Sequence, residues 1–100
     1  MATITKRDLV VAVSNKTGLT QDKVFGVIQE TLNQITENLA SGDQIALRNF
    51  GAFEVRKAKS KVGRNPKAPQ DTVVIPARAV VKFKPGKEMK EKVAQLLPNL

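Results

Sequence analysis

The side chains best suited to chemistry in this sequence are lysines and arginines gathered in one short stretch. This stretch holds six cations and no acid: Arg56, Lys57, Lys59, Lys61, Arg64 and Lys67. Such groups bind polyanions, because each contact with a phosphate releases condensed counterions. A basic surface that serves only solubility normally has acids interspersed. The stretch therefore predicts a polyanionic partner.

The charge of the whole chain is unevenly divided. The formal net charge is +8 over 100 residues. Residues 1–50 carry five lysines and arginines against five acids, whereas residues 51–100 carry twelve against four. The entire excess lies in the second half of the sequence, so one part of the molecule is expected to meet the partner.

The sequence offers little for catalysis. Histidine, cysteine, tryptophan and tyrosine are absent, which removes the commonest general base and excludes disulfides and thiolate metal sites. Nine carboxylates remain, and their spacing suggests neither an acid–base pair nor a metal cluster. The nucleotide-binding patterns GxxxxGK(S/T) and GxGxxG are also absent. We therefore expect no enzymatic activity, no catalytic residue, no metal and no cofactor.

Two helices are predicted in the first half of the chain. Thr5 with Asp8 fits an N-terminal cap, and Gly18 fits a C-terminal stop, for a helix over about Lys6–Thr17. Thr20 is a second N-cap, and apolar residues then recur at helical spacing as far as Ser41-Gly42: Val24, Ile28, Leu32, Ile35 and Leu39.

The apolar period then changes to that of strands. Alternation over 45–47 and 53–55 flanks a turn at 49–51. Beyond Val55 the alternation continues without core residues, which predicts the outward strand of a long polar hairpin, and apolar alternation returns over 73–83. A short helix is expected over about Lys87–Leu97, stopped by Pro98 and buried through Met89, Val93, Leu96 and Leu97.

This order of elements predicts an α+β fold in a single domain over 1–100. Its helical part would span about 1–42, its sheet and arm about 43–84, and its C-terminal helix about 87–97. No stretch approaches the roughly 20 apolar residues that cross a bilayer. We expect a cytoplasmic protein.

The body without its arm carries more apolar surface than so small a domain comfortably buries. All four phenylalanines occupy positions whose pattern predicts burial: Phe25, Phe50, Phe53 and Phe83. Two copies packed through the second helix and the sheet would bury this surface, so we expect a dimer. The alternative is a monomer in which the first and third helices cover everything.

The kind of nucleic acid follows from what the basic stretch lacks. Single-strand and RNA modules commonly stack bases on exposed aromatics, and this stretch has none. A duplex offers instead dense phosphate charge and a minor groove about 6 Å wide, which suits a cationic ribbon. Pro66 is either a turn residue or an apolar wedge between base steps, and the pattern alone does not choose between them.

Two segments, NFGAFEVRKAKSKVGRNPK (49–67) and ARAVVKFKPGKEMKEKV (77–93), resemble the bacterial HU and integration host factor family. The resemblance extends over nearly the whole chain. It implies an intertwined dimer with a helical body, a β-sheet saddle and two protruding β-hairpin arms that embrace duplex DNA. Minor-groove bending is a known property of this family and is carried over with the resemblance.

The resemblance also implies roles for single residues. Pro66 would be the intercalating wedge, with Arg64 and Asn65 beside it in the groove. The remaining DNA-binding set would line the arms and hold flanking phosphates: Arg56, Lys57, Lys59, Lys61, Lys67, Arg78, Lys82, Lys84 and Lys87. We expect a nucleoid-associated architectural protein that bends and compacts double-stranded DNA largely without direct base readout.

Several alternatives stay open. The protein could form a homodimer or one subunit of a heterodimer with a related chain. A structural RNA-binding protein of the ribosomal type is the rival binding hypothesis, because the composition permits it. An enzyme or an enzyme-inhibiting module is the rival of a different class, with no motif in its favour.

Overall fold

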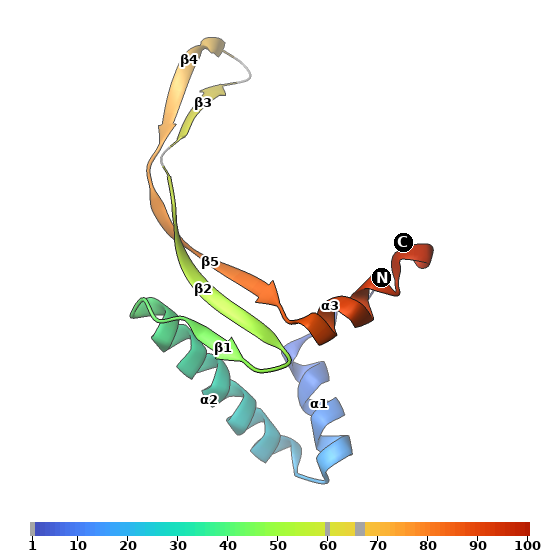
Figure 1. Ribbon diagram of the computed structural model, residues 1–100. Coiled ribbons are helices and arrows are strands. Elements are labelled where there is room, and N and C mark those ends of the chain that lie inside the picture. The colour runs from blue at the N-terminus through green and yellow to red at the C-terminus, as the bar shows by residue number, and fades with distance from the viewer. Residues whose placement is uncertain (1, 60, 66–67) are drawn as a thin grey trace. The chain divides into compact units, whose positions relative to one another are not determined.

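The computed structural model describes residues 2–59, 61–65 and 68–100, and for 61–65 and 68–75 it describes the backbone alone. The chain divides into two compact units, residues 1–37 and 38–100. Figure 1 shows the order of the elements along the chain. The predicted single domain over 1–100 stays a prediction.

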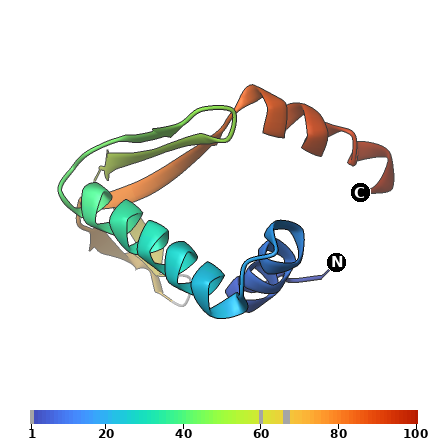
Figure 2. The same ribbon diagram turned by 90° about the horizontal axis from the view of Figure 1, so that it is seen from below.

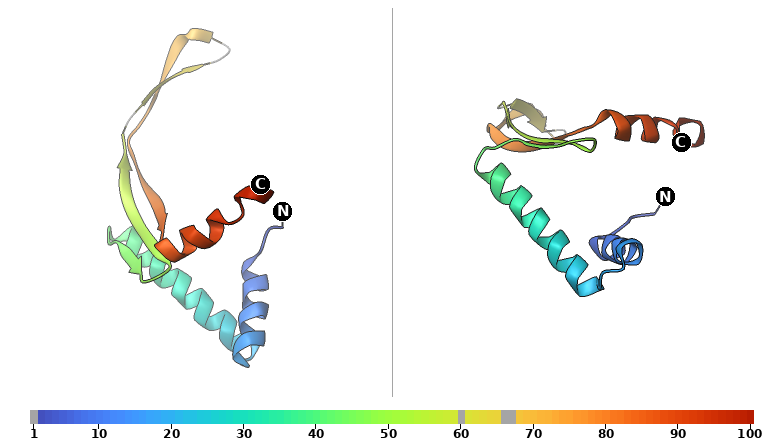
Figure 3. Two further views of the ribbon diagram at one scale, coloured as in Figure 1. Left: turned by 45° about the vertical axis from the view of Figure 1, so that its right-hand side comes forward. Right: turned by 60° about the horizontal axis from the view of Figure 1, so that its bottom comes forward.

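The first unit is a helical hairpin. Helix α1 spans Lys6–Thr17 and is followed by α2, Gln21–Ala40, whose last three residues belong to the second unit. Figures 2 and 3 show the two helices joined by a short connection. Val10 and Val24 are the buried hydrophobic residues of the described chain, with 4% and 3% of their surface exposed.

Local capping explains where these helices begin and end. Thr5 and Asp8 form the predicted capping box, and Gly18 ends α1 in the left-handed conformation with φ 77°. The Lys23 amide donates to the Thr20 hydroxyl at 3.3 Å, in agreement with a second cap. The predicted bounds of α1 and the predicted start of α2 are confirmed.

The second unit contains two antiparallel sheets. Strands β1 (Ile45–Leu47), β2 (Gly51–Ala58) and β5 (Arg78–Pro85) form one sheet in the order β1-β2-β5. Strands β3 (Lys61–Asn65) and β4 (Ala68–Ile75) form a separate two-stranded sheet. Figure 3 shows this hairpin as the continuation of β2 and β5.

The apolar alternation over 73–83 predicted a continuous returning strand. In the structure this strand is not continuous. It is interrupted at Pro76 and Ala77, which belong to neither β4 nor β5. Proline lacks the backbone N–H that a ladder needs, which gives a physical reason for the interruption. The three-stranded sheet therefore ends at the pair Ala58–Arg78, and the second ladder begins at Lys61–Ile75.

The C-terminal helix is shorter than predicted. Helix α3 spans Lys87–Ala94, and a 3-10 turn follows at Leu97–Asn99. The Leu96 amide donates to the carbonyl of Val93 at 3.0 Å, so the chain changes to the tighter i to i−3 pattern before Pro98, whose ring opposes a further α-helical turn. The expected buried side is also wrong for the single chain: Met89 is half-buried, and the others are exposed, namely Val93, Leu96 and Leu97.

The prediction that all four phenylalanines are buried is likewise wrong for the single chain. Phe25, Phe50 and Phe83 are 45%, 46% and 36% exposed, and Phe53 is half-buried. The Phe83 ring lies 4.8 Å from that of Phe53 and 5.7 Å from that of Phe50, so the three rings form one cluster. The physical reason is the shortage of apolar cover within one small chain.

None of the helices in the described residues is long and apolar enough to span a membrane.

Candidate nucleic-acid interface

The register of the three-stranded sheet sorts its side chains onto two faces. Residues directly opposite each other in an antiparallel pair share a face, and successive residues alternate. One face, which we call the apolar face, carries Ile45, Phe53, Val55, Val81 and Phe83. The other, the cationic face, carries Glu54, Arg56, Arg78, Lys82 and Lys84. Four cations thus share one surface with a single acid among the described residues.

Glu54 lies at the centre of this cationic face. Its Oε2 accepts hydrogen bonds from Nε and Nη2 of Arg56 at 3.2 and 3.1 Å. Its Oε1 lies 3.3 Å from Nζ of Lys84 and accepts a bond from Gln44 at 3.4 Å. The hydrogen bonds from Arg56, and next those from Lys84, lower the pKa of Glu54 below its ordinary value.

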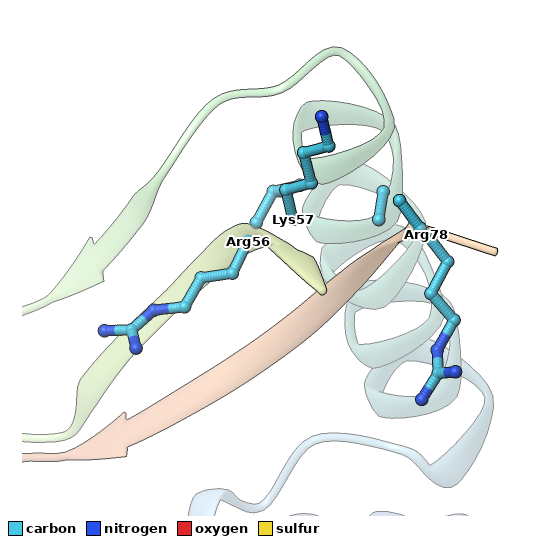
Figure 4. A pocket seen from close by; sticks show the side chains of 6 residues that line it. Arg56, Lys57 and Arg78 are labelled. Carbon is cyan, nitrogen blue, oxygen red and sulfur yellow. The ribbon is translucent and has the colours of Figure 1, made fainter. Parts of the chain in front are cut away.

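A shallow hollow of about 390 Å³ lies where the three-stranded sheet ends. It is lined by Val55, Arg56, Lys57, Ala77, Arg78 and Ala79. Figure 4 shows its three cationic side chains extending in different directions, with Arg56 and Arg78 on the cationic face and Lys57 on the opposite one. The hollow combines an apolar lining with exposed cations that belong to both faces of the sheet.

The structure describes the predicted arm residues in different detail. Lys59 is exposed directly after β2. Lys61, Arg64 and Asn65 lie in β3, where their backbones pair with Ile75, Thr72 and Ala68, and the register shifts between Arg64 and Asn65. The other two predicted arm residues lie outside the described residues: Pro66 and Lys67.

The remaining predicted residues follow the cationic face toward the C-terminus. Lys82 stands opposite Glu54 and Lys84 opposite Ala52 in the β2–β5 register. Lys87, the first residue of α3, is exposed. It comes directly after Gly86, whose amide donates to the carbonyl of Phe50 at 2.8 Å and so ties the start of α3 to the β1–β2 turn.

The sheet therefore brings together Arg56, Arg78, Lys82 and Lys84, while the roles predicted for the arm residues stay predictions. Sequence reasoning missed Glu54 as a member of this surface. The signal was present, because Glu54 stands two residues before Arg56 in an alternating strand and so shares its face. In the described part of the chain no group of three carboxylates could hold a metal ion.

Comparison with known sequences places these features in a wider context. A family model described as bacterial DNA-binding protein matches residues 4–94. The probable DNA-binding protein HU of Chlamydia trachomatis is 44% identical over 90 residues, which cover 90% of this chain and 90% of that protein. The integration host factor subunit alpha of Haemophilus influenzae is 42% identical over 93 residues, which cover 93% of this chain and 96% of that subunit.

Solved structures agree with the sequence comparisons. The chain in the HU–DNA cocrystal structure from Anabaena has a TM-score of 0.83 and 41% identity, covering 90% of this chain and 97% of that one. HU from Thermotoga maritima has a TM-score of 0.64 and 32% identity, covering 89% of this chain and 97% of that one. The predicted α+β fold, with helices and an antiparallel sheet, is confirmed by these likenesses.

Proposed function

The chain belongs to the bacterial DNA-binding protein family of HU and integration host factor, and on that premise we propose that it binds and bends duplex DNA as an architectural protein. The predicted family resemblance is thereby confirmed. The family consists of non-enzymatic DNA-binding architectural proteins that act as homodimers or heterodimers. This confirms the prediction of no enzymatic activity, and it supports duplex DNA and a related subunit as the partners.

The observation that carries the proposal is the cationic face of the sheet. Arg56, Arg78, Lys82 and Lys84 are all exposed there, and Lys87 follows at the start of α3. Cations on a rigid sheet can meet successive phosphates without reading bases. This shared surface supports the proposal that the body of the protein binds the flanks of the DNA.

Binding to random, nicked and pre-bent duplexes at several salt concentrations tests the proposal. If a dimer neutralises about ten phosphates, log K falls against log salt with a slope of about −9. Nicked and pre-bent duplexes are expected to bind more tightly than intact random duplex, because smooth bending costs on the order of 1–6 kcal/mol. A clear preference for structured RNA in competition would favour the ribosomal-type alternative instead.

For the arm we propose that residues Lys59, Lys61, Arg64, Asn65 and Lys67 lie along the minor groove and that Pro66 enters between base steps. An extended ribbon suits a groove about 6 Å wide, and an apolar wedge can unstack a step and kink the duplex. The family membership and the backbone pairing of β3 with β4 support this arrangement. Specificity would then come mainly from the deformability of the DNA.

Substitution of the wedge separates bending from affinity. Pro66→Ala is expected to keep most of the phosphate-dependent affinity while reducing the bend, because the lysines and arginines remain but the ring is lost. Fluorescence energy transfer between the ends of a short duplex measures the bend. Pro98→Ala, in the 3-10 turn after α3, is the matched control and should leave it unchanged. An unaltered bend in Pro66→Ala would remove the wedge from the mechanism.

We propose in addition that the protein is cytoplasmic and associated with the nucleoid, and that residues 1–100 act as a single DNA-binding domain. The first follows from duplex DNA as the partner, and the second is supported by the one family model that matches residues 4–94. Fluorescence microscopy of the tagged protein in the cell tests the first, since a signal that does not overlap the stained nucleoid would contradict it. Limited proteolysis with and without DNA tests the second.

A further inference from the structure

The cationic face contains one acid, Glu54, and its position is unusual for a surface that binds phosphates. Among the described residues of this face, every other charged side chain is a lysine or an arginine. Cations of two strands approach the Glu54 carboxylate, Arg56 from β2 and Lys84 from β5. A negative charge at this point repels the phosphates of DNA, so its presence calls for a separate role.

Both oxygens of the carboxylate are occupied. Oε2 accepts two bonds from the Arg56 guanidinium, at 3.2 and 3.1 Å, and Oε1 lies 3.3 Å from the Lys84 ammonium. Planar guanidinium groups bind carboxylates and phosphates with the same donors. Glu54 therefore offers these two cations what a DNA phosphate would offer them.

The exposure of the three side chains makes an exchange of partners possible. The Glu54 side chain is 20% exposed, whereas those of Arg56 and Lys84 are 45% and 52% exposed. The cations can thus be reached from solvent while the acid is largely covered. Ion pairs between exposed side chains are weak and open readily.

We propose that Glu54 is an internal competitor for DNA phosphate, which holds Arg56 and Lys84 in the free protein and must give them up when DNA binds the cationic face. This inference rests on the proposed function. Each cation taken over by DNA exchanges one carboxylate contact for one phosphate contact. Glu54 thereby weakens binding at the sheet relative to the arm, and its freed carboxylate attracts solvent cations, which lowers the net release of ions on binding.

A pair of charge-matched variants tests the competition. Glu54→Gln removes the competitor, and Glu88→Gln removes one acid of α3 that pairs with Lys92 at 3.4 Å, outside the proposed DNA-binding set. Both raise the net charge by one per chain. Relative to Glu88→Gln, Glu54→Gln is expected to bind duplex about threefold to tenfold more tightly at low salt, from two released ion pairs. Its slope of log K against log salt should be steeper by up to about one per chain, because one freed carboxylate no longer takes up a cation.

A second variant keeps the net charge constant. Glu54→Asp shortens the side chain by one methylene and draws the carboxylate away from both cations, so it should shift affinity and slope in the same direction by a smaller amount. Circular dichroism at each salt concentration verifies that all variants are folded. If Glu54→Gln does not fold, the comparison of Glu54→Asp with the wild type still tests the competition.

The outcomes separate this inference from the proposed function. Suppose that the wild type binds duplex with a steep salt slope, that Glu54→Gln behaves as Glu88→Gln does, and that Glu54→Asp behaves as the wild type does. The competition is then refuted and the proposed function stands. If the wild type does not bind duplex at all, both fail. Tighter, more salt-sensitive binding of the two Glu54 variants alone supports the competition.

Discussion

Asn49 is held in the left-handed backbone region, with φ 67°, in the turn between β1 and β2. The amide of Phe50 donates to the carbonyl of Leu47 at 3.0 Å and closes this turn. Asparagine tolerates the left-handed region better than most residues, and glycine tolerates it without steric cost. The turn therefore depends on the residue type at position 49.

Substitution at this position should affect stability through backbone strain. We expect Asn49→Ala to lower the free energy of unfolding by about 1 kcal/mol, because its Cβ is disfavoured at positive φ. Asn49→Gly removes the same amide group without that strain and should be close to the wild type. Urea unfolding at one fixed protein concentration measures both. Equal losses in the two variants would show that the amide group, and not the backbone, carries the effect.

Single residues governed by local rules could be predicted from the sequence. Thr5, Asp8 and Gly18 were, because capping needs only neighbours within one helical turn. Glu54 was not, although its face follows from alternation. Its significance depends on Lys84, which lies thirty residues further along the chain and meets it only through the β2–β5 register.

At the scale of elements, α1 begins with a reciprocal cap. The Asp8 amide donates to the Thr5 hydroxyl at 3.3 Å, and the Thr5 amide donates to the Asp8 carboxylate at 3.0 Å. The bond from the Thr5 backbone, more than any other contact, lowers the pKa of Asp8 below its ordinary value. The charged form of Asp8 is thus favoured in the folded protein.

This lowered pKa makes the cap sensitive to acid. A carboxyl whose folded pKa lies below its unfolded value contributes stability that is complete above the unfolded pKa, about 3.9, and that disappears as pH falls through the folded one. The stability difference between wild type and Asp8→Asn should therefore be largest above about pH 5 and shrink in more acidic solution. Thermal unfolding across this range measures it, with Glu91→Gln of α3 as a control. A pH-independent difference would contradict the assignment.

Elements were predicted best where periodicity is strong and least well at their ends. Both helices of the first unit and strands β1 and β2 follow directly from the apolar spacing. The interruption at Pro76 and the end of α3 at Ala94 were missed. At Pro76 the missing proline N–H prevails over an apolar pattern that would otherwise continue, whereas at the C-terminus Pro98 was recognised as a stop but the earlier change to i to i−3 bonds was not.

At the scale of the molecule, one chain leaves much apolar surface exposed. Phe25 and Phe50 are 45% and 46% exposed, and three residues near the C-terminus are more exposed still: Val93 at 56%, Leu97 at 73% and Leu100 at 82%. Small domains bury a modest share of their surface and are often completed by a partner. The family membership supports a second subunit as that partner.

A dimer makes stability dependent on concentration. We expect the thermal midpoint of the wild-type protein to rise with protein concentration, because dissociation accompanies unfolding. Sedimentation equilibrium should give twice the mass of one chain when this chain is studied alone. A midpoint that does not change, together with the mass of a single chain, would contradict a homodimer and leave a heterodimer with a related chain as the expected assembly.

The function class was predictable because charge is a property of the sequence itself. The excess of cations in residues 51–100 predicted one polyanion-binding side, and family membership supports DNA as the polyanion. The burial of the phenylalanines was not predictable for one chain, because periodicity identifies which face is apolar but not which molecule covers it.

The gap between the β2–β5 ladder and the β3–β4 ladder also determines where a segment of this protein could be exchanged for that of a related protein. Pairing in the three-stranded sheet ends at Ala58–Arg78, and the second ladder begins only at Lys61–Ile75. Cuts after Ala58 and before Arg78 would divide no strand and separate no described cross-strand pair. Hairpins of different lengths or charges could therefore be grafted at these two junctions, which makes the arm an exchangeable module on a constant scaffold.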